Sequence, residues 1–347
     1  MNAPAARVAV WRGGDRFEIE SVPLPRPGVG EVLVRVDLAT VCGSDHHTVA
    51  GRRPAPCPSV LGHEGVGVVV ATGTAVGVRP GQRVVWSVAV SCGHCDRCTA
   101  GRTAKCRSVR KLGHEPYASD WRLAGSYASH VLLPAGAALV LVPDEVADCV
   151  AAPAGCATAT VMAAAEAAGP MRGRRVLIGG AGMLGLTAAA FAVDAGAAEV
   201  IVFDRDRTRL ELAARFGATA TVMVGGAPND LDDLGELGEV DVALDFSGAS
   251  SAVSGSLDAL GVGGRLVLVG SVAPGPPVPV DPERVVRSWL TITGVHNYEP
   301  RHLQQAVDFL ACNERPWSSL VEAPVPLDQL DRVLSSPTRR PRAAVRA

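Results

Sequence analysis

A glycine-rich turn between an apolar strand and a small-residue helix constrains the fold of this chain more than any other feature. Val176–Ile178 leads into the run Gly180 to Gly185, and a helical pattern follows. The order of strand then helix repeats to about Val269. Repeated units of this kind form a parallel sheet covered by helices on both faces. We therefore predict an α/β fold with a doubly wound parallel sheet.

The same turn predicts a dinucleotide site. Gly180 permits the tight turn, Gly182 lets the backbone approach a pyrophosphate, and Gly185 allows close helix-to-strand packing. The N–H groups at the start of the helix are oriented toward the phosphates. A simple tight turn without a ligand is the alternative, but the position of the motif between strand and helix favours coenzyme binding.

Asp204 ends the next strand, 19 residues after Gly185, and is expected to bind the ribose hydroxyls of the coenzyme. Its charge repels a 2′-phosphate, which favours NAD over NADP. NADP is the alternative, because a nearby guanidinium group could bind its 2′-phosphate; the candidates are Arg205, Arg207 and Arg209.

Four cysteines crowd into one Gly-rich segment with the spacing CxxCxxC followed seven residues later by the fourth; they are Cys92, Cys95, Cys98 and Cys106. Four thiolates around one ion form a closed tetrahedral site typical of structural zinc. A redox dithiol would leave two of these cysteines unexplained. A DNA-binding zinc module would need a basic surplus, which is missing.

A second set of metal-binding residues is dispersed along the chain. Cys42, His63 and Cys156 form a two-cysteine, one-histidine set that leaves a fourth position on zinc for water or substrate, an arrangement typical of catalytic zinc. Their spacing alone does not unite them, and each is otherwise an ordinary core or loop residue.

Length and composition exclude several classes of protein. The chain has 347 residues, more than one hydrophobic core usually covers, and 48% of them are hydrophobic. A formal net charge of −2 gives no general attraction for nucleic acid or anionic membranes. We find no secretory signal or membrane span and expect a cytoplasmic protein.

The first third of the chain has a different sequence pattern from the central part. Short β-rich runs alternate with Gly and Pro turns up to about Val142, a pattern typical of a β-barrel. The segment after about Val295 is too short to stand alone and is expected to pack back on the first domain. It closes on a strand-like run, Arg342 to Arg346. The arginines near its end favour a solvated chain terminus over a basic tail; they are Arg339, Arg340 and Arg342.

The motifs together resemble the zinc-dependent medium-chain alcohol dehydrogenases over nearly the whole chain. In the order of that family they read CGSDHH, LGHEGVGVVVATG, VRPGQRV, CGHCDRCTAGRTAKC, GSYASHVLLP, GCATAT, GGAGMLG and IVFD. The resemblance implies a GroES-like β-barrel catalytic domain interrupted by a Rossmann coenzyme domain. We place the GroES-like domain with its structural zinc lobe at residues 1–155, the Rossmann domain at 156–295, and the return to the catalytic domain at 296–347.

The resemblance also implies roles for individual residues. Cys42, His63 and Cys156 match the catalytic zinc ligands, and Glu64 matches an acidic neighbour that lies behind or transiently joins the metal. Asp45 matches a carboxylate that orients the ligand histidine.

A proton relay and a coenzyme site follow from the same resemblance. Ser44 and His47 match the hydroxyl and imidazole of the relay. The expected coenzyme contacts are Thr160, Gly180, Gly182, Leu184, Gly185, Asp204 and Arg209. Two features depart from the pattern. Gly43 replaces a basic residue that some members place on the pyrophosphate, and His46 beside His47, expected as an exposed loop histidine, makes the relay assignment ambiguous.

The implied activity is reversible hydride transfer between an alcohol and NAD. The alternatives are a zinc-free quinone or enone reductase on the same fold, which would lack the Cys42, His63 and Cys156 set, and a non-catalytic cofactor-binding protein. The family commonly pairs the edge strands of its coenzyme domains, so we expect a homodimer or homotetramer through the strand near Leu290 to Val295.

The substrate is predicted from Arg53, which falls where members acting on apolar alcohols place an apolar pocket residue. A guanidinium there favours a small polar alcohol, namely a polyol, a cyclitol or a phosphonate-bearing alcohol. Residues 48–56 and 111–121 also resemble a bacterial subgroup associated with phosphonate utilisation. The alternative is that Arg53 points to solvent. A second Gly-His-Glu run places His114 outside the matching position, and we expect a surface histidine there, with a residue of the substrate loop as the alternative.

Overall fold

The computed structural model of the chain describes residues 4–117, 120–225, 234, 237–336 and 338–347. The chain divides into two compact units. One combines Met1–Ala159 with Asn297–Ala347, and the other is Thr160–His296. The polypeptide therefore enters the second unit from the first and returns to it.

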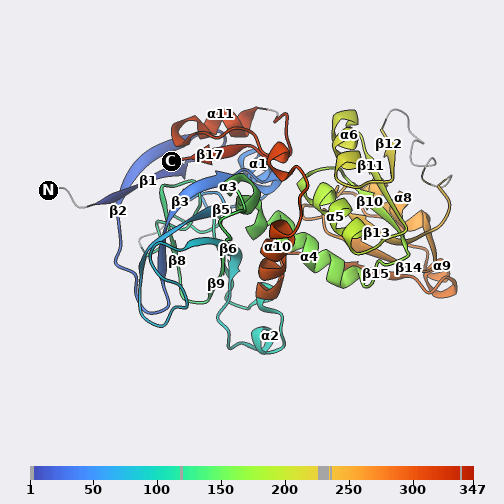
Figure 1. Cartoon of the computed structure of the whole chain (residues 1–347), viewed down its shortest axis with the longest axis horizontal. Coiled ribbons are helices and arrows are strands. Elements are labelled where there is room, and N and C mark those ends of the chain that lie inside the picture. The colour runs from blue at the N-terminus through green and yellow to red at the C-terminus, as the bar shows by residue number, and fades with distance from the viewer. Residues whose placement is uncertain (1–3, 118–119, 226–233, 235–236, 337) are drawn as a thin grey trace. The chain divides into compact units, whose positions relative to one another are not determined.

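The second unit contains the predicted parallel sheet (Figure 1). Its strand order is β12-β11-β10-β13-β14-β15, which is the doubly wound order in which the two halves diverge from the first strand. The six strands are β10 (Arg175–Gly179), β11 (Glu199–Asp204), β12 (Ala220–Met223), β13 (Val240–Asp245), β14 (Leu260–Leu268) and β15 (Thr291–Gly294). The strands pair in parallel throughout, which confirms the predicted fold class.

Helix α4 (Ala157–Ala168), which begins in the first unit, precedes the first of these strands. The described helices between successive strands are α5 (Met183–Asp194), α6 (Arg207–Arg215), α8 (Ser250–Asp258) and α9 (Pro282–Arg287). The central strands are buried on both faces, so Leu177, Ile178 and Ile201 have no solvent-exposed surface. The small side chains of α5 are almost all buried, which lets this helix lie close to the sheet.

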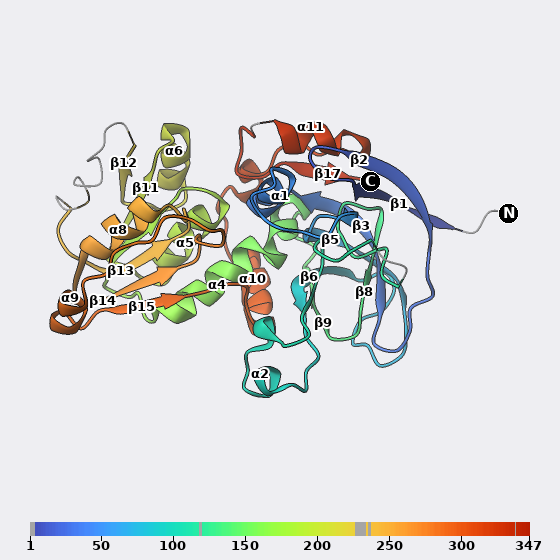
Figure 2. The same ribbon diagram turned by 180° about the vertical axis from the view of Figure 1, so that it is seen from behind.

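The first unit is built on an eight-stranded sheet and a three-stranded sheet (Figure 2). The large sheet has the order β16-β17-β3-β5-β6-β7, with β8 pairing β3 and β9 pairing β6, and the small one has the order β2-β1-β4. Their strands are β1 (Ala5–Trp11), β2 (Phe17–Pro23), β3 (Val32–Thr40), β4 (Ser59–Val60), β5 (Glu64–Thr72), β6 (Arg83–Val90), β7 (Arg110–Lys111), β8 (His130–Leu133), β9 (Ala137–Leu141), β16 (Val325–Pro326) and β17 (Ala344–Arg346). The β-rich character expected for the first third of the chain is confirmed.

Short helices complete this unit: α1 (Gly43–Val49), α2 (Asp96–Thr99), α3 (Asp148–Ala151), α10 (Pro300–Ala311) and α11 (Leu330–Ser335), with 3-10 turns η1 (Thr103–Lys105), η2 (Ala152–Gly155), η3 (Trp317–Leu320) and η4 (Leu327–Gln329). The last strand, β17, pairs antiparallel with β3, so the end of the chain is part of the main sheet.

Strand β8 covers only part of the GSYASHVLLP motif. Ser126 and Tyr127 do not extend β8 but donate their backbone N–H groups to the carbonyls of Gly62 and Leu61. These bonds fix the segment against the loop that carries His63. Tertiary hydrogen bonding has here replaced strand pairing.

No single helix in the described part of the chain is long and apolar enough to cross a membrane. One bent pair, Asp148–Gly155 with Ala157–Ala168, meets that test by length and composition only.

Candidate functional site

The dispersed cysteines and histidine meet in the first unit. Ligand atoms of Cys42, His63, Glu64 and Cys156 all lie within 4.8 Å of one another. Cys42 precedes α1, His63 comes just before β5, Glu64 is the first residue of β5, and Cys156 follows η2. The fold thus brings together residues from three separate segments, a grouping that their spacing along the chain does not predict.

This donor set fits zinc. Zn–S and Zn–N bonds of about 2.3 and 2.0 Å in a tetrahedron separate ligand atoms by roughly 3.3–3.8 Å, so only a small contraction is needed. Cys42 and His63 are buried, and Cys156 is half-buried. Hydrogen bonding from Cys156 and the charge of Arg342 lower the pKa of the Cys42 thiol well below its ordinary value. A thiolate at this position is the form that binds metal.

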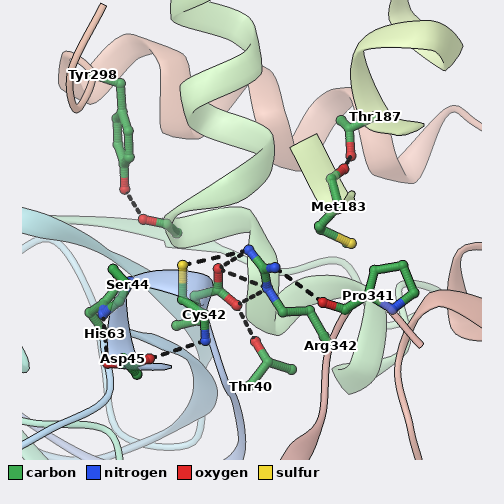
Figure 3. Close-up of polar contacts among 12 residues, drawn as sticks. Thr40, Cys42, Ser44, Asp45, His63, Met183, Thr187, Tyr298, Pro341 and Arg342 are labelled. Carbon is green, nitrogen blue, oxygen red and sulfur yellow. Dashed lines mark hydrogen bonds and ion pairs between the residues drawn. The ribbon is translucent and has the colours of Figure 1, made fainter. Parts of the chain in front are cut away.

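The carboxylate of Glu64 is held by a buried arginine that sequence analysis assigned to the solvated chain end. Arg342 is 6% exposed and bonds Glu64 through Nε and Nη2, with the closest N···O distances at 2.9 Å (Figure 3). Thr40 Oγ1 donates to Glu64 Oε2 at 2.6 Å. The expectation for Arg342 was therefore wrong, because the strand that follows it pairs with β3 and carries it inside.

The bidentate ion pair has a consequence for the donor set. Both carboxylate oxygens of Glu64 accept bonds from Arg342, while Arg342 Nη2 also lies 3.6 Å from Cys42 Sγ. Burial raises the pKa of Glu64, and the charge of Arg342 acts against this rise. In this geometry Glu64 is turned to the guanidinium, which leaves two sulfurs and one imidazole as the natural ligands.

Asp45 lies next to the cluster, where it contacts His63 as an orienting carboxylate would and also contacts Cys42 and Tyr127. Its Oδ2 accepts the backbone N–H of Cys42 at 3.0 Å and the hydroxyl of Tyr127 at 2.9 Å. Its Oδ1 forms an ion pair with His63 Nδ1 at 3.6 Å. Burial acts to lower the pKa of His63, but the charges of Asp45 and Cys42 raise it to about 9. Asp45 therefore contacts two ligand residues at once. The role of Tyr127 was not predicted, although this residue stands in the GSYASHVLLP motif.

The proposed relay residues lie on α1. Ser44 Oγ is 3.5 Å from His63 Nε2, close to the donor set. His47 is half-buried, and burial together with the charge of Arg52 lowers its pKa. His46 is not the exposed loop histidine that the sequence suggested, because it is helical and its Nδ1 lies 3.1 Å from the carbonyl of Leu334.

Arg53 and His114 come together beside the donor set. Arg53 Nη1 lies 3.4 Å from His114 Nε2, and the ring of His114 is 5.1 Å from that of His63. His114 is half-buried, so the expected surface histidine is wrong. The second Gly-His-Glu run was the sequence signal that could have placed His114 at the site. In the structure Gly113 has a φ of +72° and packs against the backbone of Gly62, so the second run lies next to the first.

The four clustered cysteines form the second donor set. Cys95 Sγ lies 3.5 Å from Cys98 Sγ and 3.9 Å from Cys106 Sγ, and Cys106 Sγ lies 3.5 Å from Cys92 Sγ. A tetrahedral site with Zn–S bonds of about 2.3 Å has sulfurs about 3.8 Å apart, so the geometry fits zinc without rearrangement. Backbone N–H bonds from Arg107 and Cys98 lower the pKa of Cys95 to about 6.

One carboxylate secures this cysteine lobe, residues 92–106, to the rest of its unit. Glu299 precedes α10 and accepts the backbone N–H groups of Thr103 at 2.9 Å and Ala104 at 3.1 Å. The adjacent Tyr298 donates its hydroxyl to the carbonyl of Gly155, which precedes Cys156 (Figure 3). Neighbouring residues in the returning segment therefore contact the chain segments that carry the two donor sets.

The glycine-rich turn lies in the second unit. Gly180 has a φ of +91°, and a Cβ at Gly185 would lie 1.8 Å from the carbonyl oxygen of Gly180. A Cβ at Gly182 would meet nothing within 4 Å, which leaves open space at the start of α5. Asp204 Oδ2 accepts the N–H of Ala181 at 2.6 Å, so this carboxylate lies at the turn.

The other expected coenzyme contacts are distributed around the second unit. Thr160 is buried in α4, Leu184 is half-buried in the first turn of α5, and Arg209 forms an ion pair with Asp206 at 3.6 Å. Their contact with a coenzyme stays a prediction.

Comparison with known proteins adds independent support. A family profile described as "Alcohol dehydrogenase GroES-like domain" matches residues 28–144, and one described as "Zinc-binding dehydrogenase" matches residues 184–312. The L-threonine 3-dehydrogenase of Deinococcus deserti is 37% identical over 313 residues, covering 86% of this chain and 84% of that relative.

Two solved structures resemble the chain over their full length. An alcohol dehydrogenase from Thermotoga maritima has a TM-score of 0.91 at 27% identity, covering 99% of this chain and 100% of that one. A zinc-binding dehydrogenase from Sinorhizobium meliloti bound to NADP has a TM-score of 0.87 at 28% identity, covering 99% of this chain and 100% of that one.

Proposed function

Because the chain belongs to the zinc-dependent medium-chain alcohol dehydrogenase family, we propose that it transfers hydride reversibly between a small polar alcohol and NAD. The substrate class we propose is a polyol, a cyclitol or a phosphonate-bearing alcohol. The observation that carries the proposal is the cluster of Cys42, His63 and Cys156, with the neighbouring Glu64 engaged by Arg342. A zinc-free reductase of this fold has no need for such a donor set.

In the proposed reaction these three residues hold the catalytic zinc. The metal supplies Lewis acidity that brings the pKa of an alcohol hydroxyl toward neutrality. In this proposal Ser44, whose Oγ lies 3.5 Å from His63 Nε2, would accept the hydroxyl proton, and His47 on the same helix would pass it toward solvent. Asp45 holds the backbone of Cys42 and the ring of His63 in position throughout.

Arg53 supports a polar substrate because its guanidinium is fixed next to His114 rather than left in solvent. The relative named L-threonine 3-dehydrogenase favours a second candidate, a hydroxy amino acid. A panel of ethanol, polyols, cyclitols, hydroxyphosphonates and L-threonine, assayed with NAD and with NADP on zinc-loaded protein, tests both. Best turnover on ethanol would overturn the proposed substrate class.

We propose NAD as the preferred coenzyme because Asp204 lies at the glycine turn. Asp204→Ser should improve the ratio of NADP to NAD use by about 10- to 100-fold, since an anion that repels the 2′-phosphate is removed while Arg205 and Arg209 stay. The ratio of kcat/KM values for the two coenzymes measures this. A native enzyme that already prefers NADP would contradict it.

We propose a homo-oligomer built on β15, the last strand in the order of its sheet. Trp289, just before this strand, is 79% exposed, and Ile292 within it is 36% exposed. An open strand edge with apolar neighbours favours pairing with a second copy. Sedimentation at micromolar concentration should give a dimer or tetramer; a monomer would refute it.

A further inference from the structure

The loop after α1 holds Arg53 in a fixed place relative to the metal-ligand cluster. The backbone N–H groups of Arg52 and Arg53 both donate to the carbonyl of His47, at 2.9 and 3.2 Å. The loop therefore folds back on the helix that begins next to Cys42. The side chain then reaches His114, whose ring lies 5.1 Å from the ring of His63. The guanidinium is thus one imidazole ring away from a metal ligand.

A second cation shares this region. His114 donates its backbone N–H to the carbonyl of Lys111 at 3.1 Å, so both residues belong to one turn. Lys111 is half-buried, and its pKa is lowered by burial and by the charges of Arg53 and Lys105. Lys111 therefore shares a turn with the histidine that Arg53 contacts, and the charge of Arg53 acts on its ammonium group.

No carboxylate of the described residues forms an ion pair with the side chain of Arg53 or Lys111. The nearby Glu115 is engaged elsewhere, since it accepts the backbone N–H of Lys111 at 2.8 Å and pairs with Arg110 at 3.5 Å. Arg110 in turn lies over the ring of Trp121 at 4.3 Å. The positive charge beside the donor set is therefore not neutralised by these neighbours.

Half-buried like charges are costly unless an anion offsets them. A carboxylate or phosphonate can accept charge-assisted bonds from a guanidinium, whereas a neutral polyol or cyclitol leaves the charge uncompensated. An ammonium group near Arg53 and Lys111 would add a third positive charge. The local charges thus discriminate among the polar alcohols.

We propose that the substrate is an alcohol bearing an oxyanionic group, a carboxylate or a phosphonate, and no ammonium group, with Arg53 as its anchor and Lys111 as a supporting cation. This inference rests on the proposed dehydrogenase function and narrows its substrate class. It separates the chain from the hydroxy amino acid in the name of its relatives.

A matched series tests the proposal. Butan-2-ol, 3-hydroxybutanoate and 2-hydroxypropylphosphonate share the CH3–CH(OH)–CH2 unit and differ in the terminal group, and L-threonine adds an ammonium to 3-hydroxybutanoate. We expect kcat/KM for at least one of the two anions to exceed that for butan-2-ol and for L-threonine by about 10- to 100-fold. The two anions compared with each other decide between carboxylate and phosphonate. Equal or better use of butan-2-ol or L-threonine would overturn the proposal.

Variants assign the effect to Arg53. Arg53→Leu should bring the ratio of kcat/KM for the preferred anion over butan-2-ol close to one. The neighbouring Arg52 is exposed, so Arg52→Leu serves as the matched control and should keep the ratio. Lys111→Met should lower it by a smaller factor. A ratio unchanged in Arg53→Leu would contradict the assignment.

A binding measurement separates this inference from the proposed function. Methylphosphonate and acetate should raise the thermal midpoint of zinc-loaded native protein and of Arg52→Leu, and should have no such effect on Arg53→Leu. If no alcohol is oxidised but this pattern is found, the proposed function fails and the anion site stands. If alcohols are oxidised but neither anion shifts the native protein selectively through Arg53, the anion site fails alone.

Discussion

The two donor sets of the first unit differ in how the chain builds them. The cysteine lobe takes all four sulfurs from the fifteen positions between Cys92 and Cys106, and two of these cysteines are half-buried. The second set draws on Cys42, His63 and Cys156, and its surroundings reach to Arg342. A local loop is enough for the first, whereas the second exists only once the main sheet is complete.

The groups that stabilise the thiolates also differ, being local in the cysteine lobe and remote in sequence at the dispersed set. Backbone N–H groups stabilise the thiolate of Cys95, as any tight loop around a metal can provide. Cys42 relies on Cys156 and on the buried Arg342, residues remote in sequence. The cysteine lobe is thus expected to serve stability and the dispersed set to serve chemistry, a division that three substitutions can test.

Cys156→Ser should have the largest effect, a loss of kcat/KM on the order of 10⁴-fold, because a ligand of the Lewis acid is weakened. One of two zinc ions should be lost, with little change in thermal midpoint. Cys149→Ser removes a half-buried thiol outside both sets and is the control. Elemental analysis and steady-state kinetics measure the outcome. At most one zinc in carefully prepared native protein would contradict the division.

Cys95→Ser should act chiefly on stability, lowering the free energy of unfolding by roughly 4 kcal/mol, because the folding energy supplied by a structural zinc is partly lost. Thermal denaturation and zinc content measure it, and Cys312→Ser, at an exposed free thiol, is the control. If the variant keeps its thermal midpoint and loses only activity, the cysteine lobe has a chemical role, and the division between a stabilising and a catalytic donor set is wrong.

Arg342→Met should destabilise the protein by about 3 kcal/mol, because it leaves Glu64 buried without its partner. The double variant with Glu64→Gln should recover part of this loss, since the uncompensated charge is gone. Arg339→Met, at an exposed neighbour, should change stability by less than about 0.5 kcal/mol. Equal effects of the Arg342 and Arg339 substitutions in denaturant titrations would show that the buried Arg342–Glu64 ion pair contributes nothing to the free energy of unfolding.

The sequence predicted most of the second unit because its signals are local. The strand at Val240–Asp245 belongs to the predicted alternation of strand and helix, and the glycine turn begins the helix that follows β10. In both cases neighbouring residues carry the information, through hydrophobic periodicity and the conformational freedom of Gly180. The position of Asp204 near the glycine turn could also be predicted, because this residue ends β11, the strand that follows the turn and its helix.

The arrangement around the dispersed donor set could be predicted only in outline. The resemblance to a family suggested Cys42, His63 and Cys156, but their spacing did not, and Arg342 and His114 were both expected at the surface. Arg342 is buried because β17 pairs with β3, a contact between the two ends of the chain. His114 meets His63 because Gly113 packs on the backbone of Gly62.

By itself, the sequence determined the elements with short-range signals: the βα alternation, the glycine turn and the four-cysteine loop. The tertiary structure alone decided which charges become buried and which ligands meet. The physical reason is that burial and ion pairing depend on distances between remote segments, and those distances are set only when the sheets close. Arg53 illustrates the difference, because its identity is read from the sequence but its place beside His114 is given by folding.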